Sequence, residues 1–590
     1  MTDTKFRWPI IVLLLIIALA AFLRLYALSD VPPGIYPDEA MNANDAIDTM
    51  VSGEYRVFYP ENNGREGLHI WLNALVFQYL GISIFSFKLV YALAGILTIP
   101  GIYFLTREFF KFASQSRRPH TNVRFSYLAQ ELAALFAAGL VATSFWHINF
   151  SRIGFRAIFT PLLLTWATYY TMHGLRTKNL FSIVASAVLW GLGYYTYIAF
   201  RVSLVIPLFL IGATFLIYLW YHPPSFAPWR TSSFAKASVD RSDGRSRPET
   251  LGAWLKKTLI TDGWWKWKVW ALVLLATLAP LIWTFYRFPQ YLSSRSSGIS
   301  TLASDNPIGQ TLLSLGAHLQ MFFYMGDCNP RHNFPCEPQM LLPVAALFVL
   351  GLAYMVWITY EGVRYRNWYL PVATLTFIGW FLALLSPGFL TNEGLPHALR
   401  VVGVIPVVYI IAAFGLLFII RIAFPHRHHR AATWPFGIGV ALVAILLLAS
   451  FQFTHYFHEW RDHPDVIRSF NAHDVAIGEY FNSLPDDTHR YFIMDADWGV
   501  PAPAEILAEN NKDGTIPISS QTVLFIQRTE NLPVKNTTYL TMDQLPLQPP
   551  SPSVFVPLRT DDEELKERLR ALYPLGIEEQ RGSVYIYRVP

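Results

Sequence analysis

Long runs of apolar residues recur along the first 455 residues of the chain and limit what it can fold into. The first run, WPIIVLLLIIALAAFLRLYAL, covers 8–28. A run of roughly 18 or more apolar residues is long enough to cross a bilayer as a helix. Of the 590 residues, 53% are apolar and only 15% are charged, whereas a water-soluble chain of this length carries more charge. The sequence therefore predicts a multi-pass membrane protein with helical spans.

The charges between the apolar runs predict how the chain is oriented. Eleven spans are expected, and the first is too long and too poor in small residues for a removed signal peptide. Lys and Arg then separate between alternate connections, with 23 in one set and 9 in the other. The positive-inside rule places the richer set and the N-terminus in the cytoplasm. The expected spans lie near 8–28, 84–106, 128–149, 157–175, 181–199, 202–221, 269–286, 341–360, 368–386, 401–420 and 435–453. The poorer, external connections are 29–83, 150–156, 198–201, 287–340 and 387–400.

One apolar stretch, near 66–82, is not interpreted as a span. Its apolar residues follow helical spacing on one face, and His69, Asn73 and Gln78 interrupt the other. This pattern is typical of an amphipathic helix that lies on the membrane surface. A twelfth span here would also invert every later connection and place the basic set outside.

Two other parts of the chain depart from the membrane pattern. Residues 232–249 are polar and rich in Ser and Arg, which predicts a disordered cytoplasmic insertion. From His455 onward hydropathy falls, and helix and strand patterns alternate. We therefore expect a membrane domain over 1–454 and a soluble extracytoplasmic α/β domain over 455–590. The expected strands are RYFIMD, TVLFIQR and SVYIYRV, and the expected helices are DVIRSFNAHDVAIGEYFNSL and DDEELKERLRALY.

The two cysteines of the chain, Cys328 and Cys336, lie in the same predicted external loop, GDCNPRHNFPCEPQM. An oxidising compartment favours a disulfide between them, and two free thiols are the alternative. A zinc site on these cysteines is less favoured, because His332 alone cannot complete the usual four ligands.

The first carboxylates after the first span lie in GIYPDEAMNANDA, within the external connection 29–83. Asp38 and Glu39 are adjacent, so on a helix their side chains diverge by roughly 100°. One of them can therefore face a cavity while the other supports the fold. The plain alternative is that Pro37, Asp38 and Glu39 only start a helix, because acidic residues stabilise a helix N-terminus.

Basic residues in the external connections oppose the positive-inside trend and need an explanation. Several cations around one cavity suit a phosphate, which Arg binds bidentately. For any single Arg, snorkelling or a salt bridge to a loop carboxylate is the alternative. The charged and imidazole residues considered for this cavity are Arg65, Glu66, His69, Lys88, Arg152, Arg156, Asp327, Arg331, His332, Glu393, His397 and Arg400.

A lipid-linked sugar phosphate explains this combination of residues. Its phosphate needs cations at the membrane face, and its polyprenyl tail needs an apolar groove between spans. The acceptor hydroxyl or amine needs a general base, for which Asp38 is the first candidate. The phosphate leaves readily once cations stabilise its charge. No P-loop, no GxGxxG after a strand and no DxD motif flanked by strands points to a nucleotide donor.

These motifs resemble glycosyltransferase family 39, the integral-membrane enzymes of the GT-C fold that include protein O-mannosyltransferases and the aminoarabinose transferases of lipid A. The resemblance rests on a first span followed by PDE, then GREGLHIWLNALVFQYLG and SFKLVYALAGILTIPGIYFLTREFF. SRIGFRAIFTPLLLTWATYY, GDCNPRHNFP and PHALRVVGVIPVVYIIAA resemble a prokaryotic branch of the family. The resemblance covers about 1–455. It implies an all-α GT-C membrane domain that transfers a hexosyl or pentosyl group.

The resemblance also implies roles for individual residues. Asp38 matches the acidic residue taken as the catalytic base, with Glu39 beside it. Lys88 stands where many members carry an Arg near the donor phosphate, and Arg152 and Arg400 match basic positions of the same cavity. No cofactor is assigned, and metal binding is left open: some relatives bind a divalent cation, for which Glu66, His69 and His397 are the candidate ligands.

The predicted protein is a multi-pass enzyme of the cytoplasmic membrane, with polyprenyl-phosphate-linked sugar as one partner and an acceptor protein, lipid or glycan as the other. No basic groove with interleaved aromatic residues points to nucleic acid. Two alternatives remain. A secondary transporter would have internal repeats and broken helices near the midplane of the bilayer. A non-catalytic scaffold or receptor would tolerate the loss of Asp38.

Overall fold

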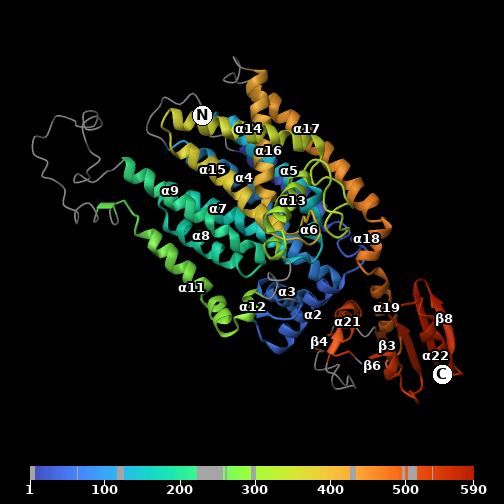
Figure 1. The fold of residues 1–590 in the computed structure, drawn as a ribbon. Helices are drawn as coiled ribbons and strands as arrows, with labels where there is room; N and C mark the ends of the chain where they lie inside the picture. Colours follow the sequence, from blue (N-terminus) through green and yellow to red (C-terminus); the bar gives the residue numbers. More distant parts are fainter. Residues whose placement is uncertain are drawn as a thin grey trace, which may run out of the picture.

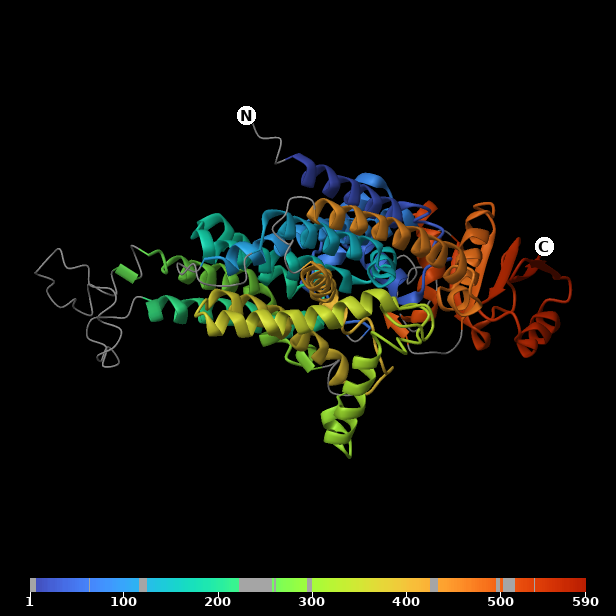
Figure 2. The ribbon, with the colours of Figure 1, turned by 90° about the horizontal axis from the view of Figure 1, so that it is seen from above.

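The computed structural model describes residues 7–590 apart from 63, 116–124, 222–256, 259–261, 294–299, 425–432, 495–498, 502–514 and 535. The described chain is a bundle of long helices with a smaller, sheet-containing domain at one end (Figure 1). A view turned by 90° shows the bundle and this C-terminal domain end to end (Figure 2). The predicted insertion 232–249 lies outside the described residues.

Each of the eleven predicted spans coincides with a helix or, in one case, with two consecutive helices. The sequence signal was the length of each apolar run, which the helices reproduce closely. These helices are α1 (Arg7–Leu25), α4 (Ile84–Ala113), α5 (Tyr127–Thr143) with α6 (Phe145–Arg152), α7 (Phe159–Thr177), α8 (Leu180–Gly193), α9 (Val205–Tyr221), α11 (Lys266–Arg287), α14 (Leu342–Arg364), α15 (Tyr369–Phe389), α16 (Ile405–Ala423) and α17 (Thr433–Thr454).

Fewer than eleven of these helices are both long and apolar enough to cross a membrane by themselves. Among the described residues, eight helices meet that test, and the pair α5 and α6, bent by 55°, makes a ninth. Helices α7 and α8 are not among them. With 14 residues, α8 is about 21 Å long, which is shorter than the roughly 30 Å hydrocarbon core. The structure therefore supports a multi-pass membrane protein but not the count of eleven.

Close helix packing in the bundle depends on glycine at the contact between α14 and α16. A Cβ on Gly351 would lie 1.8 Å from the carbonyl oxygen of Ile411, and one on Gly415 would lie 2.0 Å from that of Leu347. Only glycine allows two helix backbones to approach this closely. These two residues therefore set how the second half of the bundle packs.

Helices α2 (Pro37–Ser52) and α3 (Leu68–Leu80) lie at the same end of the bundle as the C-terminal domain (Figure 1). Helix α2 begins with Pro37 and carries Asp38 and Glu39 in its first turn. Helix α3 has 13 residues, about 20 Å, so the stretch near 66–82 is too short to span. Its polar residues His69 and Asn73 face the protein interior, whereas Tyr79 is exposed.

The C-terminal domain is built on a five-stranded mixed sheet of order β6-β3-β7-β9-β8. Strand β3 pairs in parallel with β6 and β7, and the other two pairings are antiparallel. The helices packed with it are α19 (Ala472–Asn482), α21 (Gln521–Glu530) and α22 (Glu563–Leu572). The strands are β3 (His489–Met494), β6 (Thr537–Thr541), β7 (Ser553–Pro557), β8 (Ile577–Arg581) and β9 (Val584–Val589).

Two sequence interpretations in this domain were wrong. TVLFIQR was expected to be a strand because it is rich in β-branched and aromatic residues, but it forms helix α21. Tertiary packing overrides the local preference for a strand, since every side chain from Gln521 to Arg528 is buried. The helix expected over 465–484 is broken at Asn471, which has a φ of 52°, into α18 (Pro464–Ser469) and α19.

Helix α21 attaches the C-terminal domain to α2. Arg528 is buried, and its Nη2 lies 2.8 Å from Asp48 Oδ1. The Asn44 side-chain amide donates to Gln521 Oε1 at 2.8 Å, and the Thr522 hydroxyl donates to the carbonyl oxygen of Ile35 at 3.0 Å. The C-terminal domain is therefore joined by polar contacts to the helix that carries Asp38.

Candidate functional site

A cavity of about 880 Å³ lies where the loops at this end of the bundle meet. Its wall contains residues from all five connections that the charge pattern predicts to be external. The structure therefore brings these five connections to the same end of the bundle. The polar wall residues include Asp38, Asn62, Arg201, Ser300, Asn329, Arg331, His332, Thr391, Glu393, His397 and Arg400.

The two adjacent carboxylates of α2 take different positions, as their helical spacing requires. Asp38 is half-buried and lines the cavity, where its Oδ1 accepts a hydrogen bond from Asn62 Nδ2 at 2.5 Å. Glu39 is fully buried outside the cavity wall. Burial raises the pKa of Glu39, and the positive charge of Lys88 opposes that rise. Of the pair, only Asp38 has the access that a base acting on a bound acceptor needs.

Three arginines line the cavity. Arg400 Nη2 lies 2.6 Å from Glu393 Oε2, and Arg201 Nη2 lies 3.3 Å from Glu66 Oε1. The guanidinium of Arg331 lies 4.9 Å from the centre of the Tyr36 ring. Within the described parts of the chain, no carboxylate oxygen lies within 4.0 Å of its nitrogens. Arg331 is thus the wall cation best able to take an anionic ligand.

The sequence analysis expected two further cations, Lys88 and Arg152, beside Arg400 at a donor phosphate. Both are fully buried and do not line the cavity. Lys88 Nζ donates to the carbonyl oxygens of Pro32 and Gly34 at 3.4 and 3.1 Å. Arg152 donates to three backbone carbonyls, and its guanidinium lies 4.7 Å from the centre of the Phe457 ring. Both cations hold the chain that leads from α1 into α2.

Lys88→Met is therefore expected to destabilise the protein and to leave donor affinity nearly unchanged. The substitution removes two hydrogen bonds from a charged donor and leaves the Glu39 carboxylate without its opposing charge. Hydrogen bonds of this kind contribute about 1.5–3 kcal/mol, and the free energy of unfolding should fall by a similar amount. Chemical denaturation in detergent measures it, with Lys111→Met on the exposed end of α4 as the control. Unchanged stability together with weakened donor binding would contradict this assignment.

Arg65, Glu66 and His69 also lie outside the cavity wall. Arg65 Nη1 is 2.5 Å from Asp45 Oδ2, which joins α2 to the strand β2 (Arg65–Glu66), the antiparallel partner of β1 (Phe58–Tyr59). Glu66 contacts both Arg156 and Arg201. It therefore holds Arg201, which lines the cavity, although Glu66 itself lies outside the wall. His69 is fully buried, and burial lowers its pKa well below the usual value, so it is neutral.

Arg201 is the wall cation that the sequence analysis did not single out. It lies in the four-residue connection 198–201, in which it is the only charged residue. A lone cation in so short an external connection was the available signal. Because the segment forms the short 3-10 helix Ile198–Leu204, its side chain can reach the cavity and Glu66.

Asp327, His332 and His397 form a compact cluster, in which the two histidines line the cavity and Asp327 does not. Asp327 Oδ2 lies 2.9 Å from His332 Nδ1 and 3.9 Å from His397 Nδ1. One metal-ligand atom from each of the three lies within 4.8 Å of the others. Of the candidates considered for a divalent cation, only His397 belongs to this cluster; Glu66 and His69 do not.

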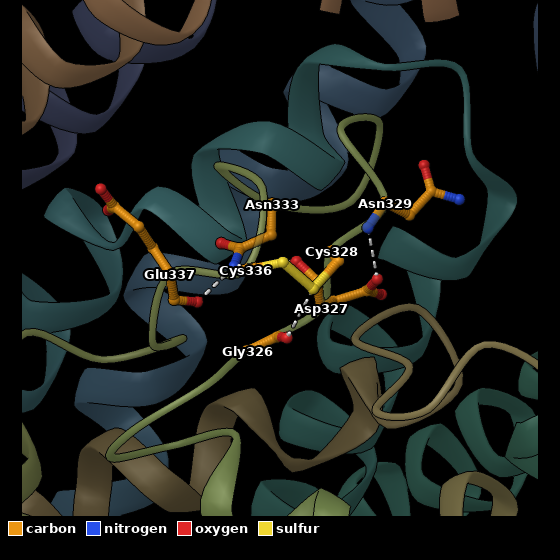
Figure 3. The surroundings of a disulfide bond; sticks show 7 residues. All are labelled: Gly326, Asp327, Cys328, Asn329, Asn333, Cys336 and Glu337. Carbon is orange, nitrogen blue, oxygen red and sulfur yellow. Dashed lines mark hydrogen bonds between the residues drawn. A yellow bond between two sulfur atoms is a disulfide. The ribbon is translucent and has the colours of Figure 1, made fainter. Parts of the chain in front are cut away.

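A disulfide between Cys328 and Cys336 closes a loop directly after Asp327 (Figure 3). His332 lies within this loop. The backbone amide of Asn329 donates to Asp327 Oδ1 at 2.9 Å. Asn333 Nδ2 donates to the carbonyl oxygen of Glu337 at 2.5 Å, across the closed end. The loop is therefore tied by one covalent bond and several hydrogen bonds.

Peptide mapping without reductant is expected to recover Cys328 and Cys336 as a joined pair. In the double variant Cys328→Ser/Cys336→Ser, the free energy of unfolding should be about 2–3 kcal/mol lower than in the wild type. This is the loss expected for a closed loop of this length. Limited proteolysis should also cut the loop 329–335 faster in that variant. Two freely alkylated thiols in protein isolated without reductant would refute the pairing.

The helical bundle with a sheet-containing C-terminal domain at one end has the GT-C fold of polytopic membrane proteins, as the sequence resemblance predicted. The structure is similar to ArnT from Cupriavidus metallidurans, both bound to undecaprenyl phosphate and in the apo state. The TM-score is 0.52 in both comparisons, at 13% and 14% identity, and 98% of this chain and 97% of that chain are covered.

A weaker similarity, with a TM-score of 0.43 and 16% identity, links 90% of this chain to 64% of AglB, the archaeal oligosaccharyltransferase of Archaeoglobus fulgidus. No protein-family profile matches the chain, and no curated protein sequence matches it. At these identities the comparisons establish the fold, while the chemistry depends on the site.

Proposed function

We propose that the chain is a membrane glycosyltransferase that moves a sugar from a polyprenyl-phosphate donor to an acceptor at the outer face of the cytoplasmic membrane. The observation that carries the proposal is the meeting of Asp38 with Arg331 and Arg400 in one cavity. Apolar residues such as Leu302 and Leu390 share the wall with them and suit a polyprenyl chain. A carboxylate, cations and an apolar surface are the three things that such a donor and its acceptor need.

In this proposal Asp38 accepts the proton of the acceptor hydroxyl or amine. The acceptor atom attacks the anomeric carbon of the sugar, and the bond from that carbon to the phosphate oxygen breaks. The bonding electrons leave with the polyprenyl phosphate, whose negative charge Arg331 and Arg400 stabilise. Arg201, positioned by Glu66, adds a third cation to the same wall.

One comparison and the sequence resemblance support the lipid-linked donor. ArnT, which shares the fold over nearly the whole chain, has been solved bound to undecaprenyl phosphate. The first external connection of this chain resembles that of glycosyltransferase family 39, with Asp38 at the acidic position. We propose a hexosyl or pentosyl donor, and a protein, lipid or glycan as the acceptor.

Direct assay of transfer tests the proposal. Purified protein in nanodiscs is incubated with polyprenyl-phosphate hexoses and pentoses and with membrane extract as the source of acceptor. Mass spectrometry then identifies the glycosylated product. We expect the product to depend on both the lipid donor and Asp38. Absence of transfer from every donor, together with donor-dependent uptake into vesicles, would favour a transporter instead.

The proposed orientation makes a separate prediction about accessibility. In a variant with Cys328 and Cys336 replaced by serine, a cysteine at Ser551 should react with a membrane-impermeant thiol reagent in intact cells or spheroplasts. A cysteine at Ser242 should react only after the membrane is opened. The positive-inside rule places these residues on opposite sides. Labelling of Ser242 but not Ser551 in intact cells would reverse the orientation.

A further inference from the structure

Two imidazoles and one carboxylate meet at the cavity wall, on two loops that are far apart in sequence. His332 belongs to the disulfide-closed loop, Asp327 directly precedes Cys328, and His397 follows α15. Asp327 and His332 are 4% exposed. The rings of His332 and His397 are stacked, with centroids 4.8 Å apart and an interplanar angle of 30°. Both rings line the cavity.

Surrounding groups hold this cluster in place. Asp327 Oδ1 accepts from the backbone amide of Asn329, and Oδ2 accepts from that of Ala398 at 2.8 Å. The backbone amide of His397 donates to His318 Nε2 at 3.2 Å. Hydrogen bonds that fix the orientation of ligand side chains are typical of metal sites in proteins. The carboxylate is therefore oriented before any ligand arrives.

We propose that Asp327, His332 and His397 bind one divalent transition-metal ion of the Zn²⁺ type, with an open coordination position toward the cavity. Two histidines and one carboxylate are a ligand set of catalytic zinc sites, which keep a fourth position open. Mg²⁺ and Ca²⁺ prefer oxygen ligands and fit this set poorly. Around a tetrahedral ion with bonds of about 2.0–2.1 Å, ligand atoms lie roughly 3.3 Å apart. The distances of 2.9 and 3.9 Å bracket that value.

The open position would face the same cavity as Arg331 and Arg400. An anionic ligand there could bind the ion through oxygen and the arginines through hydrogen bonds. That the ligand is the donor phosphate rests on the proposed function, but metal binding itself does not. The competing interpretation is that Asp327 and His332 form an ordinary ion pair that fastens the loop, in which case no metal binds.

Metal content of the full-length protein tests the proposal without any assay of transfer. The protein is purified without chelator on a tag that contains no histidine, and its metals are measured by inductively coupled plasma mass spectrometry. After chelation, Zn²⁺ and Co²⁺ are titrated back, and the visible absorption of Co²⁺ reports tetrahedral coordination. We expect about one equivalent of metal per chain, bound by the chelated protein with Zn²⁺ preferred over Mg²⁺.

Substitutions assign the ligands. Asp327→Asn keeps the shape of the side chain and an oxygen that accepts from Ala398, so the fold should persist. Its metal affinity should fall at least about 100-fold, because losing even a supporting group costs 10–100-fold. His332→Ala and His397→Ala should act alike. Glu66→Gln and His463→Ala, outside the cluster, are the controls and should retain the metal.

Less than a tenth of an equivalent of metal with no Co²⁺ spectrum would overturn the proposal, as would binding that all three ligand variants retain. Thermal unfolding of each variant identifies any that misfold, and the near-isosteric Asp327→Asn decides the case if the histidine variants do. Because binding is measured without donor, failure here leaves the proposed function standing. Failure of sugar transfer would likewise leave the metal site standing.

Discussion

Asp38→Asn is expected to abolish sugar transfer while the protein folds normally. The substitution removes the proton acceptor but keeps the size of the side chain and an oxygen for the hydrogen bond from Asn62. It removes one negative charge from the first turn of α2, whose N-cap is Tyr36, and this should lower the stability by only about 0.3–1 kcal/mol. A general base contributes about 10²- to 10⁴-fold to the rate, so the turnover number should fall by at least about two orders of magnitude.

Single-turnover transfer, measured with saturating donor, separates this effect from binding. Donor affinity should change little, because Asn removes only the negative charge that faces the acceptor. Glu54→Gln is the matched control, since it makes the same chemical change at an exposed position just beyond the end of α2. Full activity in Asp38→Asn would move the base elsewhere. Glu39 and Glu66 would then be tested first, although both are buried outside the cavity wall.

The positions of Asp38 and Glu39 were accessible from sequence because they follow from helix geometry alone. Adjacent residues on a helix point about 100° apart, so one of two neighbouring carboxylates could face a cavity while the other supported the fold. Which one took which role was not given by the spacing. It depends on Lys88 and Gly154, which act on Glu39, and on Asn62, which donates to Asp38, and all three belong to segments outside α2.

Buried cations were the hardest part of the site to predict. Lys88 and Arg152 lie near helix ends that the sequence analysis expected to be external, and there it expected both cations to face a phosphate. Both instead satisfy backbone carbonyls of the segment before α2, which includes Val31 and Gly34. The residue type and its expected depth in the membrane cannot distinguish a cation that binds phosphate from one that donates to backbone carbonyls. Every residue has a backbone carbonyl, so the sequence does not indicate which carbonyls accept such a hydrogen bond. Arg400 lay at a similar depth and does line the cavity.

Periodicity was informative where one environment surrounds a whole helix and uninformative where packing is local. The apolar runs produced helices at every predicted span, since lipid imposes one requirement along the full length. In the C-terminal domain TVLFIQR has the composition of a strand, yet Phe525 packs near Phe77 and Phe87 and Arg528 pairs with Asp48. Only a helix presents these two side chains, three residues apart, to the same neighbouring surface.

Substitution of the wall arginines is expected to weaken donor binding, and the structure predicts which substitution weakens it more. Arg331 has no carboxylate within 4.0 Å among the described residues, whereas Arg400 contacts Glu393 at 2.6 Å. A charge-assisted contact with phosphate contributes about 1.5–3 kcal/mol, or roughly ten- to a hundredfold in affinity. Arg331→Ala should therefore weaken donor binding by this factor. Arg400→Ala should have a smaller effect, because Glu393 already neutralises part of its charge.

Donor titration in nanodiscs measures both variants, and three further variants make the interpretation sharper. Arg331→Lys keeps the charge but loses the bidentate geometry, so its affinity should lie between those of the wild type and Arg331→Ala. Glu393→Gln releases Arg400 and should leave donor binding unchanged or tighter, which is the opposite sign to removing the arginine. The double variant Arg331→Ala/Arg400→Ala should be weaker than either single variant, and the apparent affinity for acceptor should stay nearly constant in all of them. If donor affinity survives in both alanine variants, these cations support the fold only and the phosphate binds elsewhere in the chain.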